Sequence, residues 1–250
     1  MPIPTEPIGS LPRAKDLTGT AAVKAVIAKL EALGSPVVTD GEQTKPSFVT
    51  YPMAGLSLAP EGVTIPFADG HTRRLPVLTG GPFRYGVYAD SYLLEAKKHA
   101  KVPVKQAVIA VSAMSLLYPE GGLPGYSRDA FLADLVSEGE KDIRRCLDAG
   151  AHCVQVDFTE GRLSLKLDPS GGVLKQFVAL NNMVLERFTE GERARIGVHT
   201  CPGGDRDSTH SADVDYAGFL PEYFKLKAGN FYLELCGEKD RPRVLRLVAE

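Results

Sequence analysis

The sequence has no tryptophan, only four cysteines among its 250 residues, and no long hydrophobic run. Spanning a bilayer takes about 20 consecutive apolar residues, and no segment reaches that length. The cysteines are too sparse for a disulfide framework in a chain of this size, which favours a reducing compartment. The first residues lack the charged start and apolar core of a secretory signal peptide. These absences predict a cytoplasmic protein.

A strong charge of either sign is also lacking. The 29 lysines and arginines nearly balance the 31 aspartates and glutamates, so the electrostatics predict neither nucleic acid nor a membrane surface as a partner. The chain is 44% hydrophobic and long enough for one large domain or two small ones.

Helical and strand-like patterns alternate along the chain. Apolar residues at helical spacing predict helices over 18–33, 88–100, 127–149, 173–188, 212–228 and 240–250. Short apolar runs predict strands near residues 37, 80, 108, 154, 197 and 232. This order predicts a parallel sheet with helical crossovers.

Two architectures fit that order. A (β/α)8 TIM barrel would lack its last one or two units, whereas a doubly wound sheet of six strands would be complete. No Gly-x-Gly-x-x-Gly follows the first strand, which argues against a dinucleotide-binding fold. We therefore predict a single, incomplete barrel over 1–250. Asp69-Gly70 between two apolar runs predicts a hairpin insertion near 62–80.

Polar side chains follow several predicted strands. His199 and Cys201 are two residues apart on a strand and therefore point to the same face. Imidazole nitrogen and sulfur are donors that zinc prefers. Glu42, Asp157 and Glu234 come at other strand ends. In a barrel such positions gather at one mouth, where active sites are built, so the sequence predicts a zinc site there.

These motifs resemble the catalytic barrel of cobalamin-independent methionine synthase and its single-domain relatives. The resemblance rests on Ile8-Gly9-Ser10-Leu11-Pro12, Asp40-Gly41-Glu42, Gln155-Val156-Asp157, His199-Thr200-Cys201 and Phe231-Tyr232-Leu233-Glu234, and it extends over nearly the whole chain.

The resemblance implies a zinc-dependent methyltransferase with a methyl-tetrahydrofolate donor and a thiol acceptor such as homocysteine. It implies that His199, Cys201 and Glu234 bind Zn²⁺, and that the family's fourth ligand, a late cysteine, lies beyond residue 250. It further implies that the acceptor is held by Ile8, Ser10, Glu42 and Asp157. Because the donor's N5 leaves only when protonated, an acid is needed. Glu160 and Asp157 are nearby candidates, but the resemblance implies that the family's acid belongs to a later part of the barrel, with a catalytic histidine beyond residue 250.

The chain departs from the family pattern at two places. The usual Asp-Glu-Pro is Asp157-Phe158-Thr159, and a variant loop, Pro202-Gly203-Gly204-Asp205-Arg206-Asp207, follows Cys201. Since there is no tryptophan, stacking on a pterin would fall to tyrosine or phenylalanine.

Two alternatives to this function stay open. The chain is a zinc-dependent alkyltransferase for another thiol, or a non-catalytic metal- or ligand-binding homologue. The incomplete barrel also raises the expectation that a second copy or a partner chain supplies its missing end. Cys236 follows Glu234 by two residues and could replace the absent ligand, but a buried free cysteine is the interpretation we favour.

Overall fold

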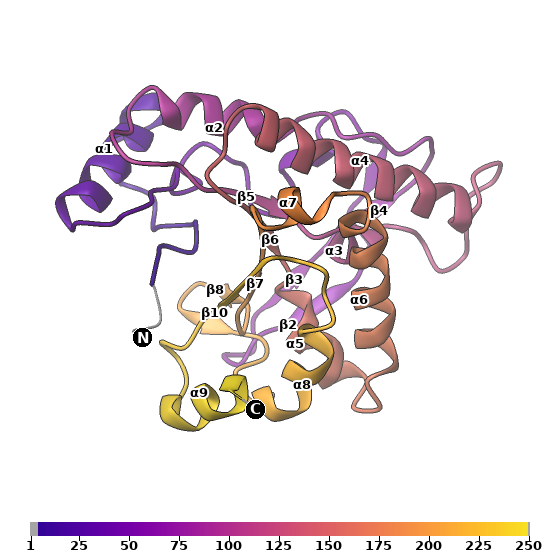
Figure 1. The fold of residues 1–250 in the computed structure, drawn as a ribbon. Coiled ribbons are helices and arrows are strands. Elements are labelled where there is room, and N and C mark those ends of the chain that lie inside the picture. Colours follow the sequence, from indigo (N-terminus) through magenta and orange to yellow (C-terminus); the bar gives the residue numbers. More distant parts are fainter. Residues whose placement is uncertain (1–4, 250) are drawn as a thin grey trace.

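A parallel four-stranded sheet forms the centre of the computed structural model, which describes residues 5–249. Its order is β10-β7-β6-β5, with bounds Asn230–Leu233, Ile196–Thr200, Val154–Asp157 and Gln106–Ile109. Val38 adds a parallel bridge to Val104 beside β5. The predicted parallel α/β arrangement is confirmed, and Figure 1 shows the strands with helices around them.

Within residues 5–249, the hydrogen bonds between strands do not close the sheet into a barrel. The strand predicted near residue 37 consists of the Val38 bridge alone. The strand predicted near residue 80 does not join the sheet: β4 (Val77–Leu78) pairs antiparallel with β1 (Leu58–Ala59). An apolar run predicts a strand but does not choose its partner, which explains this error.

Helices follow most strands, as the periodicity predicts. Their bounds are α1 Gly19–Ala32, α2 Asp90–Lys97, α3 Val111–Ser115, α4 Arg128–Asp148, α5 Glu160–Leu167, α6 Gly172–Leu185, α7 Glu190–Arg193, α8 Tyr216–Tyr223 and α9 Arg241–Ala249, with a 3₁₀ turn at Tyr51–Met53. The longest, α4, starts where its cap predicts, because the Ser127 hydroxyl accepts the Ala130 N–H at 3.1 Å. The short helices α3, α5 and α7 have no counterpart in the sequence-based prediction.

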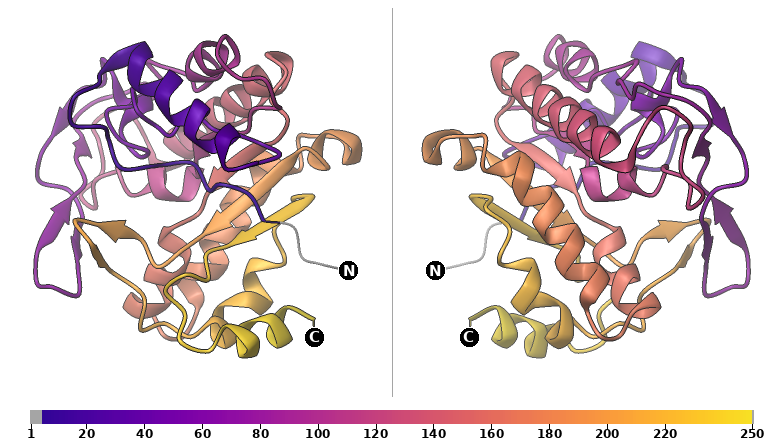
Figure 2. Two further views of the ribbon diagram at one scale, coloured as in Figure 1. Left: turned by 90° about the vertical axis from the view of Figure 1, so that its left-hand side faces the viewer. Right: turned by 90° about the vertical axis from the view of Figure 1, so that its right-hand side faces the viewer.

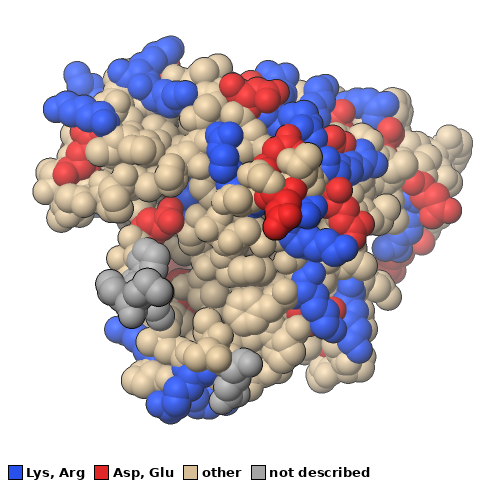
Figure 3. Space-filling model, viewed as in Figure 1, with Lys and Arg blue, Asp and Glu red and all other residues tan. Residues whose placement is uncertain are grey.

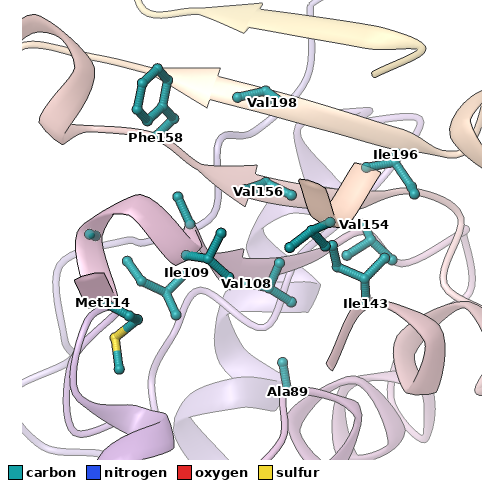
Figure 4. Close-up of a cluster of buried hydrophobic side chains, with 14 of the residues drawn as sticks. Ala89, Val108, Ile109, Met114, Ile143, Val154, Val156, Phe158, Ile196 and Val198 are labelled. Atoms are coloured by element: carbon teal, nitrogen blue, oxygen red, sulfur yellow. The ribbon is translucent and has the colours of Figure 1, made fainter. Parts of the chain in front are cut away.

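The hydrophobic core lies between the sheet and these helices. Alternate strand residues point toward the helices, among them Val108, Val154, Val156, Ile196 and Val198 (Figure 4). All five are less than a tenth exposed. Because side chains alternate along a strand, the intervening residues, including Gln155, Asp157 and His199, occupy the opposite face of the sheet.

The predicted hairpin forms, with β2 (Thr64–Pro66) and β3 (Thr72–Arg74) flanking Asp69-Gly70. It lies beside a second small hairpin, β8 (Gly204–Asp205) and β9 (Ser208–Thr209), as Figure 2 shows. Asp205 accepts hydrogen bonds from Arg73 at 2.5 and 2.6 Å and lies 2.9 Å from His71 Nε2. The insertion is therefore tied to the loop that follows Cys201.

The surface carries charges of both signs. Basic and acidic side chains are interspersed over the face drawn in Figure 3. In the described part of the chain, no helix combines the length and the apolar character needed to cross a membrane.

Candidate active site

The sheet face opposite the helices is polar although it is buried. Asp157 of β6 is the register partner of His199 of β7, and Tyr232 of β10 is the next partner along. Asp157 and His199 are 7% and 3% exposed. A row of buried polar side chains across neighbouring strands is what a binding site requires and a packed core does not.

Val38 occupies the position of the first predicted strand, and the turn that follows it places Glu42 at this polar face of the sheet. Gly41 and Glu42 both have left-handed backbones, with φ of 64° and 54°. Glycine adopts this conformation readily, but for glutamate it is strained and needs support. The support comes from Asp40, whose Oδ1 accepts the Glu42 N–H at 3.0 Å. The turn thus holds a buried carboxylate in a fixed position.

Glu42 and Asp157 are brought together, as the sequence predicts. Burial, together with the charge of Glu42, raises the pKa of Asp157. Gln155 on the same strand donates to Asp157 Oδ1 at 2.7 Å. Two neighbouring buried carboxyl groups oppose each other's ionisation, so this pair is suited to bind a cationic or hydrogen-donating group.

The predicted acceptor-binding segment 8–10 runs alongside this turn. The Gly9 carbonyl accepts the Thr39 hydroxyl at 2.9 Å, and the Leu11 N–H donates to the Gly41 carbonyl at 3.1 Å. Gly9 is buried against Ala107 and Gln155, whereas Ile8 is half-buried and Ser10 is exposed. Backbone contacts thus place this segment at the site.

His199 sits on the polar face with one ring nitrogen free. Its Nδ1 atom is buried without a hydrogen-bond partner among the described residues. Burial, reinforced by the positive charge of Lys105, lowers the pKa of His199 to about 3. A neutral imidazole has a lone pair available, which is the state that a metal ligand needs.

Cys201 and Glu234 leave the ends of adjacent strands. The Glu234 N–H donates to the Thr200 carbonyl at 3.1 Å, which continues the β7–β10 pairing. Glu234 Oε1 accepts the Gly237 N–H at 3.0 Å, while Oε2 is buried without a partner in the described chain. Burial, with the charges of Asp157 and Glu234, raises the pKa of the Cys201 thiol to about 12, although the Gly203 N–H opposes this.

The three predicted zinc ligands do not form a closed metal site as they stand. Within residues 5–249, no group of three or more His, Cys, Asp or Glu side chains is gathered closely enough to hold a metal ion. Two observations nevertheless fit a cation: the donor types are those that zinc takes, and His199 Nδ1 and Glu234 Oε2 are both buried without a hydrogen bond from the described part of the chain. The residues present therefore suit zinc chemically, and their assignment as ligands stays a prediction.

Cys236 is exposed, so the interpretation as a buried free cysteine is wrong. The strand β10 ends at Leu233, and the chain then turns so that Gly237 contacts Glu234. Cys236 consequently has no regular strand on which to share a face with Glu234. Cys146 and Cys153 are buried.

Glu160 is a further buried acid at this end of the sheet, in the first turn of α5. Ser112 donates its hydroxyl proton to Glu160 Oε1, and Asn181 Nδ2 donates to Ser112 Oγ at 2.8 Å. Glu160 Oε2 is buried without a partner in residues 5–249. Burial is the main cause that raises the pKa of Glu160 to about 8. The carboxyl group therefore carries a proton at neutral pH.

Three buried cations contribute to this region, and the sequence predicted burial for none of them. Lys45 contacts Glu42, and Arg162 is fully buried against Glu238 at 2.9 Å and over the Tyr216 ring at 4.3 Å. Lys105 is 1% exposed and lies 4.1 Å from the Tyr232 ring centroid. In the sequence, the burial of Lys45 is signalled only by its position three residues after Glu42. A solvent-exposed lysine could occupy the same position.

The fold is similar to that of solved cobalamin-independent methionine synthases. A B12-independent methionine synthase from Shewanella sp. W3-18-1, solved in complex with selenomethionine, superposes with a TM-score of 0.63 at 19% identity, covering 89% of this chain and 68% of that one. A putative vitamin-B12 independent methionine synthase from Listeria monocytogenes gives a TM-score of 0.57 at 16% identity, with 92% and 74% covered.

These matches confirm the resemblance at the level of the fold. No protein-family model and no curated protein sequence matches the chain.

Proposed function

We propose that this protein is a zinc-dependent methyltransferase that moves a methyl group from a methyl-tetrahydrofolate donor to a thiol, for which homocysteine is the acceptor that the resemblance implies. The observation that carries the proposal is a pair of buried atoms without a hydrogen-bond partner in residues 5–249, His199 Nδ1 on β7 and Glu234 Oε2 directly after the adjacent strand β10. Cys201 directly follows β7. The fold likeness supports it, and so does the complex of the Shewanella protein with selenomethionine, whose skeleton matches a methylated product. The proposed fold is an incomplete (β/α)8 barrel.

In this proposal His199, Cys201 and Glu234 bind the metal. Bound zinc would hold the acceptor sulfur as a thiolate, the nucleophilic form, at neutral pH. Ile8, Ser10, Glu42 and Asp157 orient the rest of the acceptor. The buried site excludes water, which would otherwise solvate and weaken the thiolate.

Glu160 is the acid in this proposal. As the new S–CH₃ bond forms, the N5–CH₃ bond of the donor breaks, and N5 takes a proton. Because Glu160 Oε1 accepts the Ser112 hydroxyl, the proton of the neutral carboxyl resides on Oε2, the atom without a partner in the described chain. That atom is free to donate to the leaving group.

The test is metal content and methyl transfer in matched cysteine variants. We expect one zinc per chain in the purified protein, its loss in Cys201→Ala, and its retention in Cys236→Ala, because Cys236 is exposed. Transfer from methyl-tetrahydrofolate should then be measured with a panel of thiols. Equal zinc loss in both variants would contradict the ligand assignment. Zinc binding without turnover on any thiol would favour the non-catalytic homologue, which the dispersed ligand positions also fit.

A further inference from the structure

The β2–β3 hairpin directs its polar contacts at the loop that follows β7. Among the described residues, every hydrogen bond that 64–74 make outside the hairpin goes to 205–209. Asp205 accepts two parallel hydrogen bonds from Arg73, at 2.5 and 2.6 Å, and lies 2.9 Å from His71 Nε2. A two-pronged pairing of arginine with a carboxylate fixes direction as well as distance. The hairpin therefore holds Asp205 in one orientation.

Backbone and ring contacts extend this attachment. The Ala68 N–H donates to the Thr209 carbonyl at 2.9 Å. The Phe67 ring lies against the His210 ring, with the centroids 5.5 Å apart and the planes at 67°. Edge-to-face packing of aromatic rings is favourable at this separation. Because His210 is 6% exposed, the hairpin contacts a buried residue of the loop as well as its surface.

His210 in turn fixes the backbone next to Cys201. Its N–H is shared between the Pro202 and Gly203 carbonyls, at 3.2 and 3.1 Å. Its ring covers Gly203, where a Cβ atom would lie only 1.7 Å from Nε2. Gly203 has a φ of 68°, and its N–H donates to Cys201 Sγ at 3.3 Å. A continuous series of contacts thus runs from the hairpin to the sulfur of Cys201.

We propose that the hairpin is a clamp on this loop, and that Arg73, Asp205 and His210 are positioning residues for Cys201. They keep the Gly203 N–H on the cysteine sulfur. With metal bound, that hydrogen bond would support the thiolate ligand, since groups that hydrogen-bond to ligands orient them and commonly change metal affinity by about 10- to 100-fold. This inference rests on the proposed function, in which Cys201 binds zinc.

Breaking the clamp at its surface should weaken zinc binding. Arg73→Gln and Asp205→Asn each remove the ionic contact, and we expect each to raise the dissociation constant for zinc by about tenfold in competition with a chelator. The double variant should bind zinc no more weakly than either single variant, because both changes remove the same contact. Arg73 is 58% exposed, so its replacement should leave the fold of the metal-free protein intact, which chemical unfolding checks.

Arg74 provides the matched control. It is the next residue along β3, and its Nε donates to Thr64 Oγ1 within the hairpin at 3.3 Å. Arg74→Gln removes the same charge from the same strand and should leave the zinc affinity at its wild-type value. An unchanged zinc affinity in Arg73→Gln, or an equal loss in Arg73→Gln and Arg74→Gln, would overturn the proposal.

Amide hydrogen exchange separates this inference from the proposed function, because it needs no metal. In the metal-free protein, the Gly203 amide should exchange at least about tenfold faster in Arg73→Gln than in the wild type, as followed by NMR, whereas Arg74→Gln should match the wild type. If the wild type binds no zinc, the methyltransferase proposal fails, but faster exchange in Arg73→Gln still supports the clamp. Equal exchange at Gly203 in the wild type and Arg73→Gln contradicts the clamp whether or not zinc binds.

Discussion

Glu160 is a carboxylic acid whose surroundings oppose its ionisation. An unperturbed glutamate ionises near pH 4.5, whereas burial raises the pKa of Glu160 to about 8 in the folded protein. Between these values the folded state keeps a proton that the unfolded state releases. Its contribution to stability is therefore complete below about pH 4.5 and is lost as the pH rises toward 8.

Glu160→Gln should flatten the pH dependence of stability. Glutamine keeps the shape and accepts the Ser112 hydroxyl but cannot ionise. Between pH 5 and 9, the free energy of unfolding of the wild type should fall relative to that of the variant, by on the order of a few kcal/mol at most. Urea unfolding at a series of pH values measures this difference. Parallel curves for the two proteins would refute an elevated pKa at Glu160.

For single residues, the sequence predicts which strand side chains reach the site better than it predicts which turn side chains do. Asp157 and His199 were found because each lies at the end of a predicted buried strand, and the structure makes them register partners. Lys45 was not found because the left-handed backbone at Glu42, which turns the following chain inward, has no signature in a non-glycine residue. A buried lysine also contradicts the usual expectation for its type.

Among the elements, α3 and α4 approach closely at a glycine. A Cβ atom at Gly139, inside α4, would lie 2.4 Å from Val111 Cγ1. Val111 starts α3 and is buried in the core, so neither helix can move aside cheaply. Gly139 is thus retained for packing despite its low helix propensity.

Gly139→Ala should destabilise the protein by about 1–3 kcal/mol, the usual range for overpacking. The matched control is Gly218→Ala in α8, an exposed helical position at which a Cβ atom meets nothing within 4 Å. Alanine there should stabilise by up to about 1 kcal/mol. Chemical unfolding of both variants measures whether each substitution lowers or raises the free energy of unfolding. A stabilised Gly139→Ala would mean that α3 and α4 are looser than described.

Elements with local signals were predicted well, and those fixed by distant partners were not. The cap at Ser127 and the left-handed stop at Gly34 delimit α4 and α1 within a residue or two of the expected ends. Val77–Leu78 looks like a buried strand, but its pairing with Leu58–Ala59 depends on chain folding that no local pattern encodes.

For the whole molecule, the β-α-β order predicts the parallel sheet, because crossovers force that arrangement. The order of the elements does not determine whether the sheet closes into a barrel. In residues 5–249, β6 and β7 each have a hydrogen-bonded strand on both sides, whereas β10 pairs with β7 alone. The residues of β6 and β7 are all buried, but those of β10 are half-buried.

Local opening therefore differs along the sheet, and amide hydrogen exchange should reveal it. Amide exchange should be slowest at 154–157 and 196–200, where opening requires loss of the core. It should be at least about tenfold faster at 230–233, and faster still in the exposed hairpin of β2 and β3. Mass spectrometry of the exchanged protein across a concentration series provides the measurement. Protection at 230–233 equal to that of β6 at every concentration would mean that β10 is covered in solution by chain that residues 5–249 do not provide. Protection that grows with concentration would mean that a second copy covers it, since only association depends on concentration.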